Sequence, residues 1–189
     1  MSQVTLSEKG IGPFQYRGYN YWVAPASTRV LRRWGLRGTD TGLPNLPYVN
    51  SSTPVDDHNL GDYNTNVLTS STYSSINDGN GSIGAPAATY TRELGPEWYL
   101  PNSRELHHVI YQNRSAIDAA DTTIGGSTSP SLANIGASTA RDGSNTRSTP
   151  QVWSSTERSS TSAFSQRLSD GSISSSKVNE TWVVAVRRA

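Results

Sequence analysis

The sequence predicts an α+β domain in which a small twisted antiparallel sheet is flanked by two helices and joined by long loops. A chain of 189 residues suits one ordinary domain and is short for two. Strand-like segments occur near both ends of the chain, whereas helical spacing of apolar residues occurs in its middle. Stretches rich in Gly, Pro, Asn and Ser separate these segments. We therefore expect helices packed against a sheet whose strands come from both ends of the chain.

The N-terminal third contains strand candidates and then a long irregular stretch. Residues 19–24 are aromatic and β-branched and stop at a proline, which predicts a strand. Residues 29–34 mix apolar and basic side chains and fit either a strand or a short helix. Residues 35–62 are interrupted by proline, glycine and asparagine, which favours loops. We expect residues 1–63 to supply an N-terminal strand and a docking or loop region of the same domain, whose core is residues 64–189.

Two weaker helix signals precede a clear one. Asn64 can cap a helix that runs to Ile76, although the Ser and Thr residues in it have poor helix propensity. Pro86 suits the first turn of a helix that ends at Leu94, before a Gly-Pro pair. Both segments are therefore expected to be short.

The clearest helix signal follows Asn102. The spacing of Asn102 and Glu105 is that of a capping box, in which each side chain accepts a hydrogen bond from the backbone N–H of the other residue. Apolar residues then recur at helical spacing. A helix is expected over residues 103–113, with an apolar face formed by Leu106, Val109 and Ile110.

The last forty residues favour strands. Residues 152–157 form a short strand candidate, and residues 163–168 and 173–178 are expected to form a hairpin about an Asp-Gly turn. Residues 181–188 form the most apolar strand, and the strand at residues 19–24 is its natural neighbour. This pairing would close the domain by joining its two ends.

The composition excludes several classes of protein. A net charge of +1 lacks the basic footprint of a nucleic-acid-binding protein. The absence of cysteine excludes a disulfide scaffold, a thiolate zinc site and a cysteine nucleophile. The longest apolar run, residues 182–186, is far shorter than the roughly 20 residues that cross a bilayer, so no membrane insertion is expected. Residues 1–10 lack a secretory signal, so we expect synthesis in a cytoplasm and, as one route, release within a virus particle on lysis.

Small polar residues dominate the rest. About a quarter of the chain is Ser or Thr, and residues 115–150 contain almost no large apolar side chain. We expect this segment to be a long surface loop with a helical turn or two, or an insertion.

Three blocks, in order, resemble the C-terminal domain family of a collagen-like bacterial adhesin. They are Glu-Trp-Tyr-Leu-Pro-Asn-Ser-Arg-Glu-Leu at residues 97–106, Val-Trp-Ser-Ser-Thr-Glu at residues 152–157, and an Asp-Gly hairpin followed by Val-Ala-Val-Arg-Arg at residues 184–188. The resemblance covers residues 64–189. The family is common in phage tail and virion proteins and has a C-type lectin-like fold, so the resemblance implies that fold for this chain.

Two activities of related folds do not carry over. Calcium-dependent sugar-binding lectins have Glu-Pro-Asn and Trp-Asn-Asp motifs, where this chain has Leu-Pro-Asn and Trp-Ser-Ser. Sulfatase-modifying factors use a cysteine, which the chain lacks. Asp56, Asp57 and His58 could bind a divalent cation, but a solvated loop explains them equally well. We expect no cofactor and no metal.

Catalysis is not expected either, because no nucleophile or phosphate-loop motif is present and the three histidines have no convincing partners. His107 and His108 are helix neighbours that point in different directions. We expect Glu157 to hold a buried polar network or to bridge to Arg187 or Arg188. The tryptophans could form a platform for a sugar ring, but burial is the commoner role. The expected structural core is Trp98, Leu100, Leu106, Ile110, Trp153, Glu157 and Trp182.

Candidate ligand-binding residues lie in or near two Ser-, Thr- and Asn-rich surfaces, residues 125–149 and 159–176. Short hydroxyl and amide side chains with Tyr and Arg make adaptable hydrogen-bonding surfaces. The alternative is that they only cover loops. The candidates are Tyr111, Arg141, Asn145, Arg147, Arg158, Gln166 and Arg167.

The function expected from these observations is that of a non-enzymatic phage virion protein: a tail fibre, baseplate or capsid-decoration subunit that acts in assembly or host attachment. Its partners would be other copies of itself, other virion proteins and a host-surface glycan or protein. Apolar docking residues are expected among residues 1–14, 34–36 or 43–49. The alternative is a carbohydrate-binding adhesin module of a cellular protein. A glycan binder would have a concave site with a free Tyr or Trp ring, and an enzyme a deep pocket with paired titratable groups.

Overall fold

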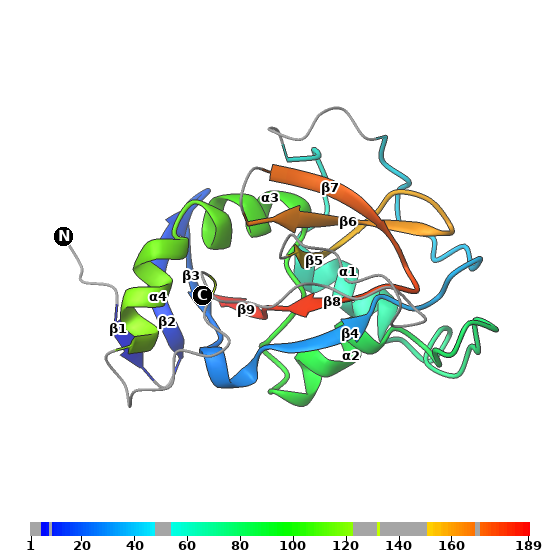
Figure 1. Ribbon diagram of the computed structural model, residues 1–189, viewed down its shortest axis with the longest axis horizontal. Helices are drawn as coiled ribbons and strands as arrows, with labels where there is room; N and C mark the ends of the chain where they lie inside the picture. Colours follow the sequence, from blue (N-terminus) through cyan, green and yellow to red (C-terminus); the bar gives the residue numbers. More distant parts are fainter. Residues whose placement is uncertain (1–4, 8, 48–53, 123–131, 133–150, 169–170) are drawn as a thin grey trace.

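The computed structural model describes residues 5–7, 9–47, 54–122, 132, 151–168 and 171–189, and Figure 1 shows the arrangement of its elements. The elements are β1 (Thr5–Ser7), β2 (Gly10–Tyr16), β3 (Tyr19–Val23), the 3-10 helix η1 (Ala26–Thr28), β4 (Val30–Arg33), α1 (Gly61–Leu68), α2 (Pro86–Glu93), α3 (Ser103–Glu105), the π-helix η2 (Leu106–Tyr111), α4 (Arg114–Thr122), β5 (Gln151–Glu157), β6 (Ser162–Arg167), β7 (Gly171–Ser176), β8 (Glu180–Val183) and β9 (Val186–Arg188).

The protein is α+β, as the sequence predicts, but it has two sheets where one was expected. A four-stranded sheet has the order β1-β2-β3-β9, and a five-stranded sheet has the order β4-β8-β5-β6-β7. The expectation of a purely antiparallel arrangement is also wrong, because β5 pairs in parallel with β8 where Val152 meets Trp182. In Figure 1, α4 lies beside β1 and β2, whereas α1 and α2 lie toward the larger sheet.

The last strand predicted from the sequence is divided between the two sheets. β8 pairs with β4, and the chain then passes through Val184 and Ala185 into β9, which pairs with β3. Both linking residues are buried, and the backbone N–H of Ala24 donates a 2.9 Å hydrogen bond to the carbonyl of Ala185. The predicted pairing with the strand at residues 19–24 is therefore confirmed for β9, and residues 29–34 contain a strand and not a helix.

Helix α1 begins at Gly61, so the prediction that Asn64 caps it is wrong. The backbone N–H of Gly61 donates a 2.8 Å hydrogen bond to Glu105 Oε1, so the helix start is held by a side chain distant in sequence. The amide of Asn64 instead points inward and donates to Asp57 and Ser155. Gly61 also has no room for a side chain, because a Cβ there would lie 2.5 Å from the Leu100 carbonyl oxygen.

The segment after Asn102 is helical, and its capping box with Glu105 is confirmed. After one turn the helix widens into the π-helix η2, which the sequence pattern did not predict. Helix α4 then occupies the start of the stretch that was expected to be an insertion or a surface loop with a helical turn or two. It is held by a buried ion pair of 2.9 Å between Asp121 and Arg29, and it packs Ile117 into the core. Pro86 begins α2 as predicted.

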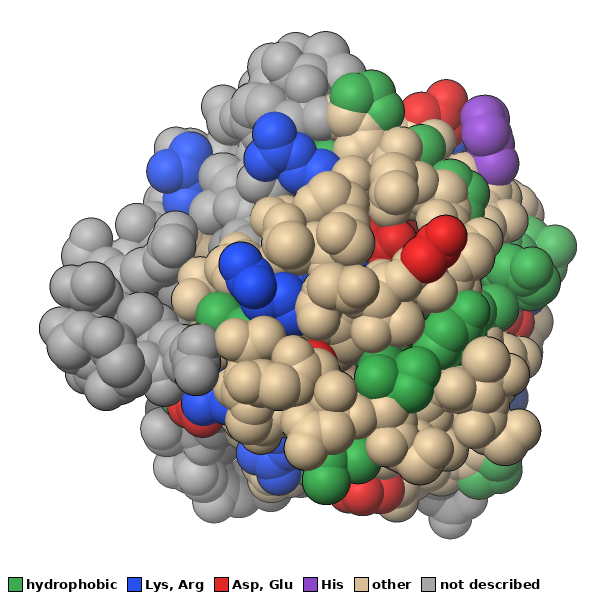
Figure 2. Space-filling view, turned by 90° about the vertical axis from the view of Figure 1, so that its right-hand side faces the viewer, with side chains coloured by type: hydrophobic (Ala, Val, Ile, Leu, Met, Phe, Trp, Pro, Cys, Tyr) green, Lys and Arg blue, Asp and Glu red, His purple; other side chains and the backbone are tan. Residues whose placement is uncertain are grey.

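Two main apolar clusters fill the interior. One joins Tyr21, Tyr99 and the buried face of η2, and the other surrounds Trp34 and Trp153. The expected docking residues at 34–36 are thus core residues, with Trp34 and Leu36 at most 1% exposed. In the coloured part of Figure 2, backbone and side chains that are neither charged nor apolar predominate, with a diagonal band of apolar side chains. No helix among the described residues is long and apolar enough to cross a bilayer.

Candidate functional site

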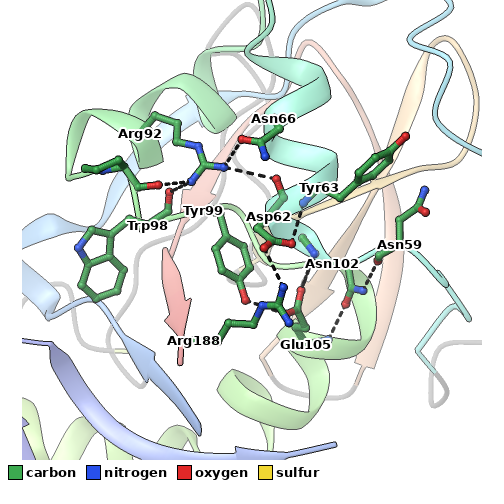
Figure 3. Close-up of polar contacts among 12 residues, drawn as sticks. Asn59, Asp62, Tyr63, Asn66, Arg92, Trp98, Tyr99, Asn102, Glu105 and Arg188 are labelled. Carbon is green, nitrogen blue, oxygen red and sulfur yellow. Dashed lines mark hydrogen bonds and ion pairs between the residues drawn. The ribbon is translucent and has the colours of Figure 1, made fainter. Parts of the chain in front are cut away.

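A pocket of about 470 Å³ opens where the start of β3, helices α1 and α2 and the end of β9 come together. Figure 3 shows several of its side chains, with Asp62 between Arg92 and Arg188. Five separate chain segments contribute to it, so only the completed fold brings the site together. The residues that line it are Tyr19, Asp62, Asn66, Arg92, Pro96, Glu97, Tyr99, Arg188 and Ala189.

Tyr19 presents an aromatic ring to the pocket. It follows a two-residue turn in which Arg17 and Gly18 have φ of 50° and 80°, the left-handed conformation that a tight hairpin between twisted strands requires. Tyr19 is 42% exposed, and the guanidinium of Arg188 lies 4.7 Å from the centre of its ring. The turn and the guanidinium together hold an accessible ring in one position.

An ion pair joins β9 to α1 across the pocket. Arg188 Nη2 lies 2.8 Å from Asp62 Oδ2. Burial lowers the pKa of Arg188, but the hydrogen bond and the charge of Asp62 outweigh it and leave that pKa above its ordinary value. Arg188 is placed by the ladder of β9, where it pairs with Tyr21 of β3. The Arg188 guanidinium is therefore charged, and it is held in place both by the pairing of β9 with β3 and by the ion pair with Asp62.

Arg92 of α2 connects its own helix to α1 and to the loop that follows α2, through hydrogen bonds of its guanidinium. Its Nη1 donates to the carbonyls of Pro96 and Trp98 at 2.7 and 2.9 Å. Its Nη2 donates to Asn66 Oδ1 at 2.6 Å and to the Asp62 carbonyl at 3.3 Å. Arg92 thus acts as a brace between α1, α2 and the loop that follows α2.

Below the pocket lies the buried carboxylate of Glu105, which is 0% exposed. The Tyr99 hydroxyl donates to Oε2 at 2.8 Å, the backbone N–H groups of Gly61 and Asn102 donate to Oε1, and the Tyr21 hydroxyl also bonds this side chain. Burial raises the pKa of Glu105, and these four donors oppose that rise. Burial and the neighbouring carboxylate raise the pKa of both tyrosines well above the ordinary range.

A second ion pair closes the rim. Arg187 Nη1 lies 2.9 Å from Glu97 Oε1, and the Arg187 guanidinium lies 5.6 Å from the ring of Trp98. Both carboxylates that line the pocket, Asp62 and Glu97, are therefore each bonded to an arginine. The charges of both carboxylates are thus compensated, whereas Arg92 is bonded only to uncharged oxygens.

The Asp56, Asp57 and His58 group does not converge on one point. Asp57 is 4% exposed and accepts hydrogen bonds from Asn64 and Thr156, so its carboxylate faces the interior. His58 is exposed, 3.8 Å from Asp56. Among the residues that the structure describes, no three His, Asp or Glu side chains gather as a metal site would require.

The predicted ligand-binding residues lie away from the pocket, and none of those described lines it. Tyr111 and Gln166 are brought together by His107, whose ring lies 5.2 Å from the Tyr111 ring and 3.4 Å from the Gln166 amide oxygen. Gln166 is itself buried, Arg158 is exposed after β5, and Arg167 is half-buried at the end of β6. The remaining predictions, Arg141, Asn145 and Arg147, fall outside the described residues.

Most residues expected in the core are buried, whereas Trp182 is half-buried. Glu157 does hold a buried polar network, but its partner is Lys177 at 2.7 Å, and Thr41 donates to the same oxygen. The expected bridge to Arg187 or Arg188 is wrong because those arginines bond to Glu97 and Asp62. The buried residues of the expected core are Trp98, Leu100, Leu106, Ile110, Trp153 and Glu157.

The residues that form the pocket carry no pattern that marked them as a site in the sequence. Tyr19 was assigned only to a strand, and Asp62, Asn66 and Arg92 lie in segments without a motif. One usable signal was present: an aromatic residue directly after an Arg-Gly turn stands at the end of a hairpin, where side chains are accessible. No family model matches the sequence, and neither the curated proteins nor the solved structures provide a match.

Proposed function

We propose that this protein is a non-enzymatic component of a phage virion that attaches to a host-surface ligand through the pocket at Tyr19. The observation that carries the proposal is an accessible aromatic ring set in a concave site whose polar groups are held by ion pairs. Binding sites of this kind combine a rigid aromatic surface with a few oriented polar groups. The proposal includes a C-type lectin-like fold, which is supported by the pairing of β3 with β9 and by the resemblance of residues 97–106 and 152–157.

The absence of catalysis is part of this proposal. Each carboxylate that lines the pocket is bonded to an arginine, and Arg92 is occupied by four oxygen atoms. Groups held in this way position one another, whereas general acid–base catalysis needs a group free to exchange a proton with a substrate. The pocket is therefore better suited to binding than to chemistry.

The second candidate is a carbohydrate-binding adhesin module of a cellular protein. The same accessible ring of Tyr19 favours it, because a sugar ring stacks on aromatic faces whatever particle carries the protein. The oligomeric state and the binding partners distinguish the virion component from the adhesin module. A virion subunit is expected to form a homo-oligomer of defined size or to bind other virion proteins.

The first test is binding to bacterial surface polysaccharides. The purified chain is applied to an array of lipopolysaccharide O-chains and capsular polysaccharides, and each spot is then checked by mass spectrometry for cleavage. We expect binding without turnover that Tyr19→Ala abolishes. The matched control is Tyr63→Ala, since Tyr63 is 56% exposed on α1 but does not line the pocket. Binding that Tyr19→Ala leaves unchanged, or cleavage of the bound glycan, would overturn the proposal.

The second test is the native mass, measured by light scattering coupled to size exclusion at micromolar concentration. A defined oligomer is the expected result for a virion subunit. A monomer that also fails to associate with phage particles would exclude the virion role and leave the adhesin module.

A further inference from the structure

We infer that the pocket at Tyr19 takes an uncharged, hydroxyl-rich ring, the neutral sugar of a surface polysaccharide, and not an acidic saccharide. This inference rests on the proposed function and adds the chemical class of the ligand. It is drawn from the charges and the remaining hydrogen-bonding atoms of the described residues that line the pocket.

The side chains that line the pocket carry equal numbers of formal positive and negative charges. Its lining contains the two carboxylates of Asp62 and Glu97 and the two guanidiniums of Arg92 and Arg188. Asp62 is bonded to Arg188, and Glu97 is bonded to Arg187 just outside the lining. Arg92 has no carboxylate partner among the described residues, and its two Nη atoms donate to four uncharged oxygens. An acidic ligand would have to lie beside the carboxylates of Asp62 and Glu97, and it could bond to the Nη atoms of Arg92 only by displacing an oxygen that they already bind, so its binding costs electrostatic free energy. A neutral ligand meets no such cost.

The hydrogen-bonding atoms of the pocket that have no partner among the described residues suit hydroxyl groups of a ligand. Asn66 Oδ1 accepts from Arg92, so the Nδ2 of Asn66 still has two N–H donors to offer. Glu97 Oε1 is bonded to Arg187, and its Oε2 makes no hydrogen bond to a described residue. A sugar hydroxyl both donates and accepts. An amide donor and a carboxylate acceptor in the same pocket can therefore bind neighbouring hydroxyls.

The ring of Tyr19 supplies an apolar surface on which a sugar ring can stack. The C–H face of a sugar is its apolar surface, and an aromatic face buries it without a polar group being lost. Arg188 lies over the Tyr19 ring, and Tyr19 as a whole residue is nevertheless 42% exposed. Because the turn at Arg17 and Gly18 and the ion pair of Arg188 hold the ring, binding costs little side-chain entropy.

The test uses monosaccharides as probes, followed by saturation-transfer NMR and titration calorimetry on the full chain. D-Glucose, D-galactose, D-mannose and L-rhamnose are compared with D-galacturonic acid and N-acetylneuraminic acid, each at about 50 mM and about 500 mM NaCl. We expect a neutral sugar to bind best, with a dissociation constant that changes less than about twofold between the two salt concentrations.

Three variants locate the contacts. Tyr19→Ala should weaken binding by about tenfold or more, whereas Tyr19→Phe, which keeps the ring, should weaken it by less than about threefold. Asn66→Asp keeps an oxygen for Arg92 and removes the two N–H donors, so it should weaken binding by about fivefold or more. Tyr63→Ala should bind as the unaltered protein does, and thermal melting checks that all variants are folded.

The outcomes separate this inference from the proposed function. An acidic sugar that binds best and loses about fivefold or more in affinity at high salt, while still depending on Tyr19, would overturn the neutral-ligand inference and leave the attachment function intact. Glycan-array binding that survives Tyr19→Ala, or a peptide bound in place of every sugar, would overturn both.

Discussion

Tyr99 lines the pocket, and its hydroxyl donates a 2.8 Å hydrogen bond to the fully buried Glu105 of helix α3. Glu105 also accepts from the first residue of α1 and forms the capping box with Asn102. One carboxylate therefore sets the start of two helices and the floor of the candidate binding site. The stability of the fold and the geometry of the pocket therefore depend on the same side chain.

Replacing Tyr99 with Phe is expected to destabilise the protein by about 1.5–3 kcal/mol, because it removes a hydrogen bond to a buried charged group. Chemical denaturation in urea measures the free energy of unfolding. Tyr63→Phe is the matched control, since that ring is exposed, and its effect should stay within about 0.5 kcal/mol. Equal effects of the two substitutions would show that Glu105 does not depend on the Tyr99 hydroxyl.

Alkaline pH is expected to unfold the protein through the same cluster. Burial raises the pKa of Tyr21 and Tyr99, so in the folded state both stay neutral above pH 10, where tyrosines of the unfolded chain ionise. The unfolded state then binds fewer protons, so stability falls as pH rises, by up to about 1.4 kcal/mol per pH unit for each residue. Ultraviolet absorbance of tyrosinate, recorded with circular dichroism, measures this. Two tyrosines should ionise only as the protein unfolds; full ionisation in the folded state would contradict the prediction.

Gly61→Ala is expected to destabilise the protein, although Gly→Ala in a helix normally stabilises by up to about 1 kcal/mol. The reason is steric, because the added Cβ would lie 2.5 Å from the Leu100 carbonyl oxygen and 2.7 Å from Glu105 Oε1. Thermal melting tests this, with Tyr63→Ala as the control for a new alanine in the same helix. An unchanged or raised melting temperature for Gly61→Ala would show that the contact relaxes freely.

Lys177→Met is expected to cost about 3–5 kcal/mol, because it leaves the buried carboxylate of Glu157 without its cation. Burial raises the pKa of Glu157 and lowers that of Lys177, so the charged forms depend on one another. The double variant Glu157→Gln with Lys177→Met should lose less than the sum of the two single variants. Urea denaturation of all four proteins gives this coupling, and strictly additive losses would contradict it.

Mild acid is expected to weaken the region around η2. Burial lowers the pKa of His107, so the folded state favours the neutral ring while the unfolded chain takes up a proton below about pH 6.5. Stability is therefore present above that pH and is lost as pH falls toward the lowered pKa of the folded state. Melting temperatures at pH about 7.5 and about 5 should fall less for His107→Gln than for the unaltered protein. His58→Gln, an exposed loop histidine, is the control, and equal losses in all three proteins would contradict the assignment.

Features encoded by neighbouring residues could be predicted from the sequence. The capping box of Asn102 and Glu105 needs only residues three apart, and Pro86 marks a helix start by its own backbone geometry. The start of α1 could not be predicted, because Gly61 is held by Glu105, which lies 44 residues further along the chain. Asn64 resembles a helix cap in the sequence, but tertiary contacts turn its side chain inward.

The candidate site could not be predicted from the sequence for the same reason. Arg188 and Asp62 are 126 residues apart, and only the placement of β9 beside β3 brings them together. Tyr111 and Gln166 have the side chains expected in a binding surface, yet contacts with His107 already engage both. Residue type indicated the chemistry of a binding surface, whereas the fold decided which residues could be reached.

The passage of the chain from β8 into β9 has a consequence for how the protein folds. β4 and β8 are distant in sequence, as are β3 and β9, so each sheet requires a long chain segment to be closed, which slows folding. Only Val184 and Ala185 separate β8 from β9, and only a short connection separates β3 from β4. Closing one sheet therefore brings the strands of the other together at little further loss of chain entropy, so both sheets are expected to form in one kinetic step.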